Sequence, residues 1–397
     1  MTGVPYIALF VGLFVQTLVT MGAYSVPAAA PAIAADLGVP GERVGVFISL
    51  VYGMGMVSAV FSVSFIHRYG AVRVSQFILI AGIGLLLSAA LGGTLLALGL
   101  GAVLLGLGYG ATAPTSSHLL MKRTAPKIRN LIFSIRQIGV PLGGVLAGFI
   151  VPPLVLAFDW QTAMGVQIIP ALILLGLLQV IRKEYDSDRD PKRTVSARGL
   201  VGPLSLLKTM PEMRALALMG FFYAGVQLCF VAYTSLHLFN KAGFDLVAAG
   251  AMLATYQISG VVSRPIWGMI ADKWLPARAM LVGMGFTMAA MAVLAGTYSE
   301  VWSWTGIFAV SVVAGATASG YTGLAFAEYA RIGGNENAAA STALGASAQF
   351  FGVMVLPTIF SVMVSLGGYT LAYNAIAVLA TFAGVSLWVF GRPHLPS

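Results

Sequence analysis

Long, uncharged apolar segments recur along the whole chain, and they limit what it can fold into. A bilayer hydrocarbon core about 30 Å thick needs roughly 20 apolar residues for one helical span. Such segments must be helices, because unpaired backbone groups are very costly in lipid. Of the 397 residues, 58% are hydrophobic and 9% are charged, whereas about 25% of residues are charged in a typical soluble domain. The sequence therefore predicts an integral membrane protein.

We predict twelve membrane-spanning helices and hence an all-α fold class. The first segment has no basic leader, so we interpret it as a full span rather than a cleaved signal peptide. The predicted spans cover approximately residues 5–33, 44–66, 74–94, 97–121, 130–156, 161–181, 214–238, 246–270, 279–297, 302–326, 338–365 and 370–391.

The basic residues are distributed unevenly about these spans. If the N-terminus is cytoplasmic, 18 of the 22 Lys and Arg residues lie on the cytoplasmic side, and only Arg43 and Lys241 face outward. This asymmetry follows the positive-inside rule, which places both termini in the cytoplasm. The net charge of +9 then reports topology and contact with anionic membrane lipid, and we expect no nucleic-acid partner. Small external loops and the lack of eukaryotic targeting signals favour a bacterial inner membrane.

One long charged stretch, from Arg182 to Arg214, separates six predicted spans from six more. Its prolines and glycines are typical of a linker, within which we expect a short surface helix near residues 201–210. Cys229 is single and lies inside a predicted span, so we expect no intramolecular disulfide and no thiolate metal site. We expect a functional monomer with three parts: an N-terminal bundle over 1–181, a cytoplasmic linker over 182–213 and a C-terminal bundle over 214–397.

A charged pattern at the end of the second span returns 205 residues later, at the end of the eighth. Repeats of this size are common in secondary transporters, which move two bundles around a site near the bilayer midplane. The shift aligns Val63 with Gly268, His67 with Asp272, Arg68 with Lys273, and Arg73 with Arg278.

With this repeat, the chain resembles the major facilitator superfamily over essentially its whole length. The family's loop pattern G-x-x-x-D-[RK]-x-G-x-[RK]-[RK] is best kept in the second copy, whereas His67 replaces the aspartate in the first. The resemblance implies two pseudo-symmetric six-helix bundles and a gating role for both loops, with the aspartate pairing to basic groups and a helix end. The alternative is that these charges serve topology alone. The gating candidates in the loops are His67, Arg68, Arg73, Gly268, Asp272, Lys273 and Arg278.

The segment SIRQIGVPLGG resembles the glycine- and proline-rich fifth helix of bacterial porters in this superfamily. Small residues there let helix backbones approach and slide, and a proline kinks the helix. Gly139, Pro141 and Gly143 are therefore further gating candidates.

Arg136 and Arg264 lie within predicted spans, about two turns from the ends that we place at the cytoplasm. Charges inside spans are costly and usually pair, line water or contact a ligand. A guanidinium suits carboxylate or phosphate oxygens, so both arginines are candidates for binding an anion. An arginine before the helix 8 loop also resembles organic-anion porters, including monocarboxylate exchangers. The alternative is that the two arginines brace the gate against Glu328, helix carbonyls or lipid phosphate.

Polar and aromatic side chains on the family's cavity-lining helices complete the candidate substrate site. Proton coupling would need a titrating group, and the candidates are His118 and Glu328. The substrate-binding candidates are Arg264, Arg136, Tyr24, Gln16, His118, Tyr223, Gln227, Tyr233, His237, Gln257, Tyr321 and Gln349.

The leading hypothesis is a secondary transporter of a small organic anion, with a carboxylate as the expected substrate and protons or a counter-anion as co-substrates. The alternative is a proton-coupled efflux pump for drugs or metabolites, although the sequence offers no clearly buried acid for it. We predict no enzyme activity and no cofactor or metal, since no nucleotide loop, metal-ligand cluster or nucleophile–base pair is evident.

Overall fold

The computed structural model describes residues 5–39, 44–195 and 197–390. In these ranges, nine helical runs are long and apolar enough to cross a membrane. The last run, Trp304–Phe390, has 87 residues, which would extend about 130 Å if straight. Left-handed glycines at Gly334 (φ 63°) and Gly368 (φ 75°) divide it into three segments. With α12 (Leu246–Lys273), the twelve membrane-spanning helices and the all-α fold class are confirmed.

The described chain forms two compact units. Unit 1 comprises the described residues within Met1–Thr124, Arg136–Ser205 and Gly333–Ser347. Unit 2 comprises those within Ala125–Ile135, Leu206–Ile332 and Ala348–Ser397. Each unit therefore includes a short segment from the other half of the sequence. The domain boundaries at residues 181–182 and 213–214 stay predictions.

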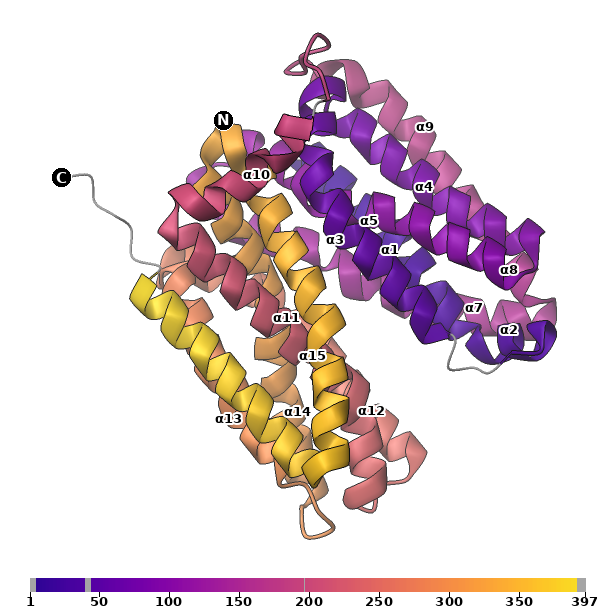
Figure 1. Ribbon diagram of the computed structural model, residues 1–397, viewed down its shortest axis with the longest axis vertical. Coiled ribbons are helices and arrows are strands. Elements are labelled where there is room, and N and C mark those ends of the chain that lie inside the picture. The colour runs from indigo at the N-terminus through magenta and orange to yellow at the C-terminus, as the bar shows by residue number, and fades with distance from the viewer. Residues whose placement is uncertain (1–4, 40–43, 196, 391–397) are drawn as a thin grey trace. The chain divides into compact units, whose positions relative to one another are not determined.

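Unit 1 is built from long helices that pack mainly on α1 and α5, and Figure 1 shows them in indigo to magenta. Small residues at their contacts let the backbones approach, as is usual for helices in lipid. Its helices are α1 (Tyr6–Ala28), α2 (Ala30–Leu37), α3 (Val44–Tyr69), α4 (Ala71–Gly92), α5 (Leu95–Arg123), α7 (Gly139–Ala157), α8 (Trp160–Val166) and α9 (Ile168–Tyr185).

The first predicted span, 5–33, is divided in the structure. Helix α1 ends at Ala28 and α2 begins at Ala30. Pro31 explains the break, because it has no N–H to donate and its ring clashes with the carbonyl four residues earlier, at Pro27. Helix α2 is tied to α8 by Asp36, whose Oδ2 accepts a hydrogen bond of 2.9 Å from Nε1 of Trp160.

Unit 2 contains the helices of the second half of the chain, and Figure 1 shows the last, yellow part of α15 beside α13. Arg278 of α13 joins the two, since its Nη2 donates to the carbonyl oxygen of Leu387 over 2.9 Å. Its helices are α11 (Pro211–Lys241), α12 (Leu246–Lys273), α13 (Ala277–Gly296), α14 (Trp304–Ala314), the π-helical turn η3 (Gly315–Ser319) and most of α15 (Thr322–Phe390).

Three helices contribute to both units, and one of them is α15, whose residues Gly333–Ser347 belong to unit 1. Helix α6 (Arg129–Gln137) follows the short 3-10 turn η2 (Pro126–Ile128) and crosses from unit 2 into unit 1 at Arg136. Helix α10 (Ala197–Thr209) lies in the predicted linker, where a short helix was expected near residues 201–210.

Candidate functional site

Arg136 is the buried cation of unit 1, with 2% of its surface exposed. Its Nη2 donates to Oε1 of Gln16 over 2.9 Å, and its Nη1 donates to Oε1 of Gln137. Within the described ranges, no ion pair includes Arg136 and its Nε has no hydrogen-bond partner. A guanidinium has five N–H donors, so neutral amide oxygens hold this cation and leave donor capacity unused.

Three gating candidates explain how Arg136 reaches Gln16. Helix α6 ends at Gln137 because Pro141 cannot donate to that residue's carbonyl and its ring clashes with it. A Cβ at Gly139 would lie 2.7 Å from the carbonyl oxygen of Leu13, and a side chain at Gly143 would also collide with α1. The two glycines therefore allow α7 to lie directly against α1.

A chain of hydrogen bonds leads from Gln16 to Tyr24. Nε2 of Gln16 donates to Oγ1 of Thr20 over 2.9 Å. Tyr109 hydrogen-bonds with Thr20 and Tyr52, and Tyr52 also hydrogen-bonds with Tyr24. Since Tyr24 is 37% exposed, the chain connects the buried guanidinium with an accessible tyrosine. Thr20, Tyr52 and Tyr109 were not among the predicted site residues.

His118 and Lys122 share a carboxylate at the basic end of unit 1, by which we mean residues 67–73, 122–123 and 182–193. Nε2 of His118 lies 2.9 Å from Oδ2 of Asp188, and Nζ of Lys122 donates to the same oxygen. The hydrogen bond to His118, with that from Lys122, lowers the pKa of Asp188 despite its partial burial. The ring of His67 meets His118 edge-to-face at 5.8 Å. The substrate and coupling roles of His118 stay predictions.

The segment after α9 makes two further contacts at this basic end. The backbone N–H of Asp190 donates to the carbonyl oxygen of His67 over 2.8 Å. Asp186 accepts from the backbone N–H groups of Val72 (2.7 Å) and Arg73 (2.9 Å), so it caps the N-terminus of α4. Burial raises the pKa of Asp186, although both hydrogen bonds oppose that shift.

Arg264 is the buried arginine of unit 2, also 2% exposed. Its Nε and Nη2 donate to the carbonyl oxygen of Ser319 over 3.2 and 3.0 Å, and Nη2 lies 3.4 Å from the Ser319 hydroxyl. Ser263 and Trp267, on the same helix, donate to the carbonyl oxygen of Ala316 over 3.2 and 2.7 Å. Helix α12 is thus fastened to η3, a π turn of the kind often found at functional sites.

Several of the other predicted substrate residues of unit 2 contact one another through rings and amides. The rings of Tyr223 and Tyr321 meet at 5.4 Å, and the Tyr321 hydroxyl lies 3.5 Å from Oε1 of Gln349. His237 stacks on Tyr369 at 4.1 Å, and Gln257 lies two turns before Arg264 on α12. Three tyrosine hydroxyls donate to carbonyl oxygens: Tyr223 to Leu281 (3.0 Å), Tyr233 to Pro357 (3.0 Å) and Tyr256 to Gln227 (3.5 Å).

The second loop copy caps a helix within unit 2. Oδ1 of Asp272 accepts from the backbone N–H and side-chain amide of Asn130 over 3.0 and 2.9 Å, and Oδ2 accepts from the N–H of Leu131 over 2.9 Å. A Cβ at Gly268 would lie 2.7 Å from Cα of Leu131, so this glycine permits the approach. The carboxylate stabilises the start of α6, whereas its gating role stays a prediction.

Glu328, the second coupling candidate, lies near the start of α15. It is buried, and its Oε2 accepts from Nε of Arg331 over 2.7 Å. The loop residue Lys273 ends α12. The coupling role of Glu328 and the gating role of Lys273 stay predictions.

Comparison with known proteins identifies the fold. The sequence profile of the Major Facilitator Superfamily matches residues 12–345. A probable nitrate transporter, NarT of Staphylococcus haemolyticus (strain JCSC1435), is 22% identical over 247 residues, which cover 62% of this chain and 61% of that protein. The matched region thus spans about three fifths of that relative's length.

Solved structures share the fold at low sequence identity. A bacterial homologue of the iron transporter ferroportin in an outward-facing state has a TM-score of 0.80 and 13% identity, covering 96% of this chain and 99% of that one. The human organic anion transporter MFSD10 has a TM-score of 0.74 and 14% identity, covering 97% and 100%. The proton:xylose symporter XylE has a TM-score of 0.75 and 12% identity, covering 98% and 96%.

Proposed function

This chain belongs to the Major Facilitator Superfamily, and we propose that it is a secondary transporter that moves a small anion, preferentially an organic carboxylate, by alternating access. The buried guanidinium of Arg136 carries this proposal. Its observed partners are amide oxygens of Gln16 and Gln137, which do not neutralise its charge. Because an uncompensated charge is costly inside a membrane, binding an anion would be favourable here.

The comparisons support an anion as the substrate class. One relative is a probable nitrate transporter, and one structural neighbour is an organic anion transporter. Nitrate and carboxylate both present planar oxygen pairs, which match the fork of a guanidinium. Arg264 is a second candidate contact, although its bonds to Ser319 also serve packing.

We further propose a bacterial inner membrane location with both termini cytoplasmic, because the basic loops follow the positive-inside rule. In that orientation, the basic end of unit 1 and the cap formed by Asp272 lie at the cytoplasmic side. Proton coupling through His118 or Glu328 is part of the same proposal.

Thermal-shift binding and uptake into proteoliposomes test the proposed substrate class. Nitrate and a panel of mono- and dicarboxylates would be compared for wild type, Arg136→Gln, Arg136→Lys and the exposed control Arg189→Gln. Loss of a charged hydrogen bond of about 2 kcal/mol predicts roughly thirtyfold weaker anion binding in Arg136→Gln. Arg136→Lys should bind weakly as well, because lysine lacks the planar fork.

The control Arg189→Gln should bind anions like the wild type. If Arg136→Gln keeps its anion affinity, Arg136 is not the anion site. If no anion binds and cationic drugs are transported instead, the efflux function becomes the better assignment.

A further inference from the structure

An open apolar groove of about 500 Å³ lies in unit 1 between α3 and α4, both of which pack against α5. We call it the hairpin groove. Its floor includes Gly108 and Ala111 of α5, and its walls carry Phe61 and Phe65 of α3 and Phe77 of α4. The three phenylalanines are 38–41% exposed. The groove therefore offers small residues at its base and accessible rings at its rim.

The turn between α3 and α4 closes one end of the hairpin groove. Helix α3 ends at Tyr69 and α4 begins at Ala71, joined by Gly70 at a left-handed φ of 92°. The ring of Tyr69 lies 5.9 Å from that of Phe65 and 5.8 Å from that of Phe77. The aromatic rim thus continues to the end of the membrane-spanning helices.

A cation stands at this closed end. Cζ of Arg68 lies 5.3 Å from the centroid of the Tyr69 ring, and stacking on a ring holds a guanidinium in a defined orientation. In the described part of the chain, no ion pair includes Arg68. The groove therefore combines an apolar channel with an unneutralised positive charge at its polar end.

We propose that the hairpin groove binds an anionic phospholipid, with an acyl chain along the groove and the phosphate on Arg68. A phospholipid of this kind matches both parts of the site. Its acyl chain packs against the apolar walls of the groove, and its phosphate complements the charge of Arg68. A small soluble anion would leave the groove unused.

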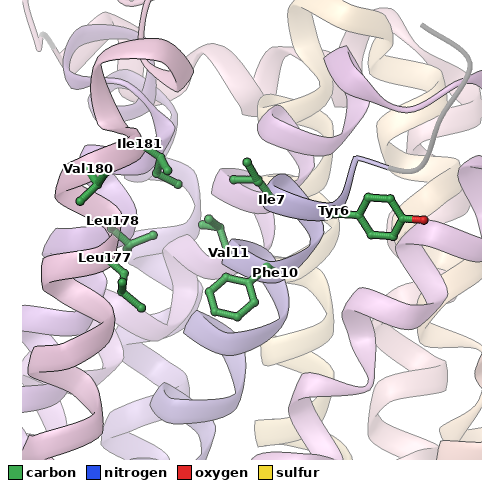
Figure 2. Close-up of a pocket in the computed structure, with 8 residues that line it drawn as sticks. All are labelled: Tyr6, Ile7, Phe10, Val11, Leu177, Leu178, Val180 and Ile181. Atoms are coloured by element: carbon green, nitrogen blue, oxygen red, sulfur yellow. The ribbon is translucent and has the colours of Figure 1, made fainter.

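A second apolar groove, of about 540 Å³, provides an internal comparison. Figure 2 shows it between α1 and α9, with Ile7 and Phe10 opposite Leu177 and Ile181. Its neighbouring cation differs from Arg68, since Nε of Arg182 lies 3.9 Å from a carboxylate oxygen of Asp186.

The face of α9 that lines this second groove ends in two residues of opposite charge, Lys183 and Glu184. Glu184 lies four residues after Val180 and therefore shares its helix face. Lys183 lies three residues after Val180, on the same face, so that its positive charge stands beside the negative charge of Glu184. The second groove is thus suited to an apolar chain but less suited to an anionic headgroup.

Native mass spectrometry of the purified full chain tests the assignment, with phosphatidylglycerol and phosphatidylcholine of identical acyl chains as probes. We expect Arg68→Gln to weaken phosphatidylglycerol binding about fivefold, the effect of one basic residue near an anionic surface. Val57→Trp, at the exposed rim, should fill the groove and weaken binding of both lipids there. Lys183→Gln and Ile7→Trp are the matched controls for charge and for filling.

The proposal holds if phosphatidylglycerol binding falls in Arg68→Gln and Val57→Trp and is kept in both controls. It is overturned if Arg68→Gln binds like the wild type, or if Lys183→Gln loses as much affinity. Arg68→Lys covers the case in which Arg68→Gln does not fold: retained preference for phosphatidylglycerol supports the site, and its absence contradicts it. Glycerol phosphate, which has no acyl chains, should not compete; competition would assign Arg68 to a soluble anion instead.

Discussion

The two units bury an arginine in different ways. In unit 1, the amide side chains of Gln16 and Gln137 hold Arg136. In unit 2, the main-chain carbonyl of Ser319 accepts two hydrogen bonds from Arg264. A side-chain amide can rotate away from its partner, whereas a carbonyl within a helical turn is fixed by the backbone.

From this difference we propose different roles for the two arginines. Arg136 can exchange an amide oxygen for an oxygen of a bound anion without disturbing a helix. Arg264 joins α12 to η3, so its loss would disturb the packing of two elements. We therefore expect substitutions in unit 1 to affect ligand binding most and substitutions in unit 2 to affect stability most.

The largest expected loss of stability is that of Arg264→Ala. It removes charged hydrogen bonds and leaves the Ser319 carbonyl buried without this donor, which predicts a loss of about 3 kcal/mol in the free energy of unfolding. Denaturation of the detergent-solubilised protein measures it. Ser319→Ala is the control, because it removes only the 3.4 Å hydroxyl contact, and should lose about 0.5 kcal/mol. Equal stability of Arg264→Ala and wild type would remove the packing role.

Gln16→Met tests whether an anion can replace the amide oxygen that Arg136 contacts in unit 1. The variant keeps the side-chain volume but leaves Nη2 of Arg136 without its acceptor, which predicts a loss of about 2 kcal/mol. An anion that replaces this acceptor should restore stability, so nitrate should raise the melting temperature of Gln16→Met more than that of wild type. If nitrate raises the melting temperature of Gln16→Met no more than that of wild type, then Oε1 of Gln16 does not occupy the position of a bound anion.

The two caps allow a more symmetrical test. Asp272 accepts three hydrogen bonds at the start of α6, and Asp186 accepts two at the start of α4. Loss of a helix cap predicts about 1 kcal/mol for either alanine variant. If Asp272 also acts as a gate, only Asp272→Ala should change the transport rate beyond its effect on stability. Equal transport in the two variants would leave Asp272 with a capping role alone.

The helices could be predicted from the sequence because lipid imposes one rule on every apolar segment. The break at Pro31 was also encoded locally, yet it was missed because the apolar pattern continues through it. In the long helical run to Phe390, by contrast, the predicted separate spans agree with the structure. Gly334 and Gly368 turn the chain at the places where composition indicates that one span ends and the next begins.

The contacts of the candidate site could be predicted only in part. Arg136 and Arg264 stood out because charge is rare inside spans. Their partners could not be derived, because Gln16 lies 120 residues from Arg136 and the Ser319 acceptor is a main-chain atom of a π turn. Asp188 was missed for a similar reason: a linker carboxylate gives no local sign that it will meet His118, 70 residues away.

The smallest expected effect concerns this linker contact. Asp188→Asn removes the charge that His118 and Lys122 share, and a partly exposed pair of this kind contributes about 1 kcal/mol or less. Hydrogen exchange of the backbone in residues 186–193 should increase up to about fivefold. Asp190→Asn is the matched control, because its side chain bonds locally to the N–H of Lys192 and its own N–H still reaches His67.

The stabilisation that Asp188 provides should decrease as the pH falls. The folded-state pKa of Asp188 lies below its ordinary value, so the unfolded carboxyl binds a proton at higher pH than the folded one. The stabilisation is therefore complete above the ordinary value near 4 and is lost as the pH falls toward the folded value. Protection of residues 186–193 that stays constant from pH 6 down to pH 3, or that is equal in wild type and Asp188→Asn, would show that the carboxylate does not hold the linker to unit 1.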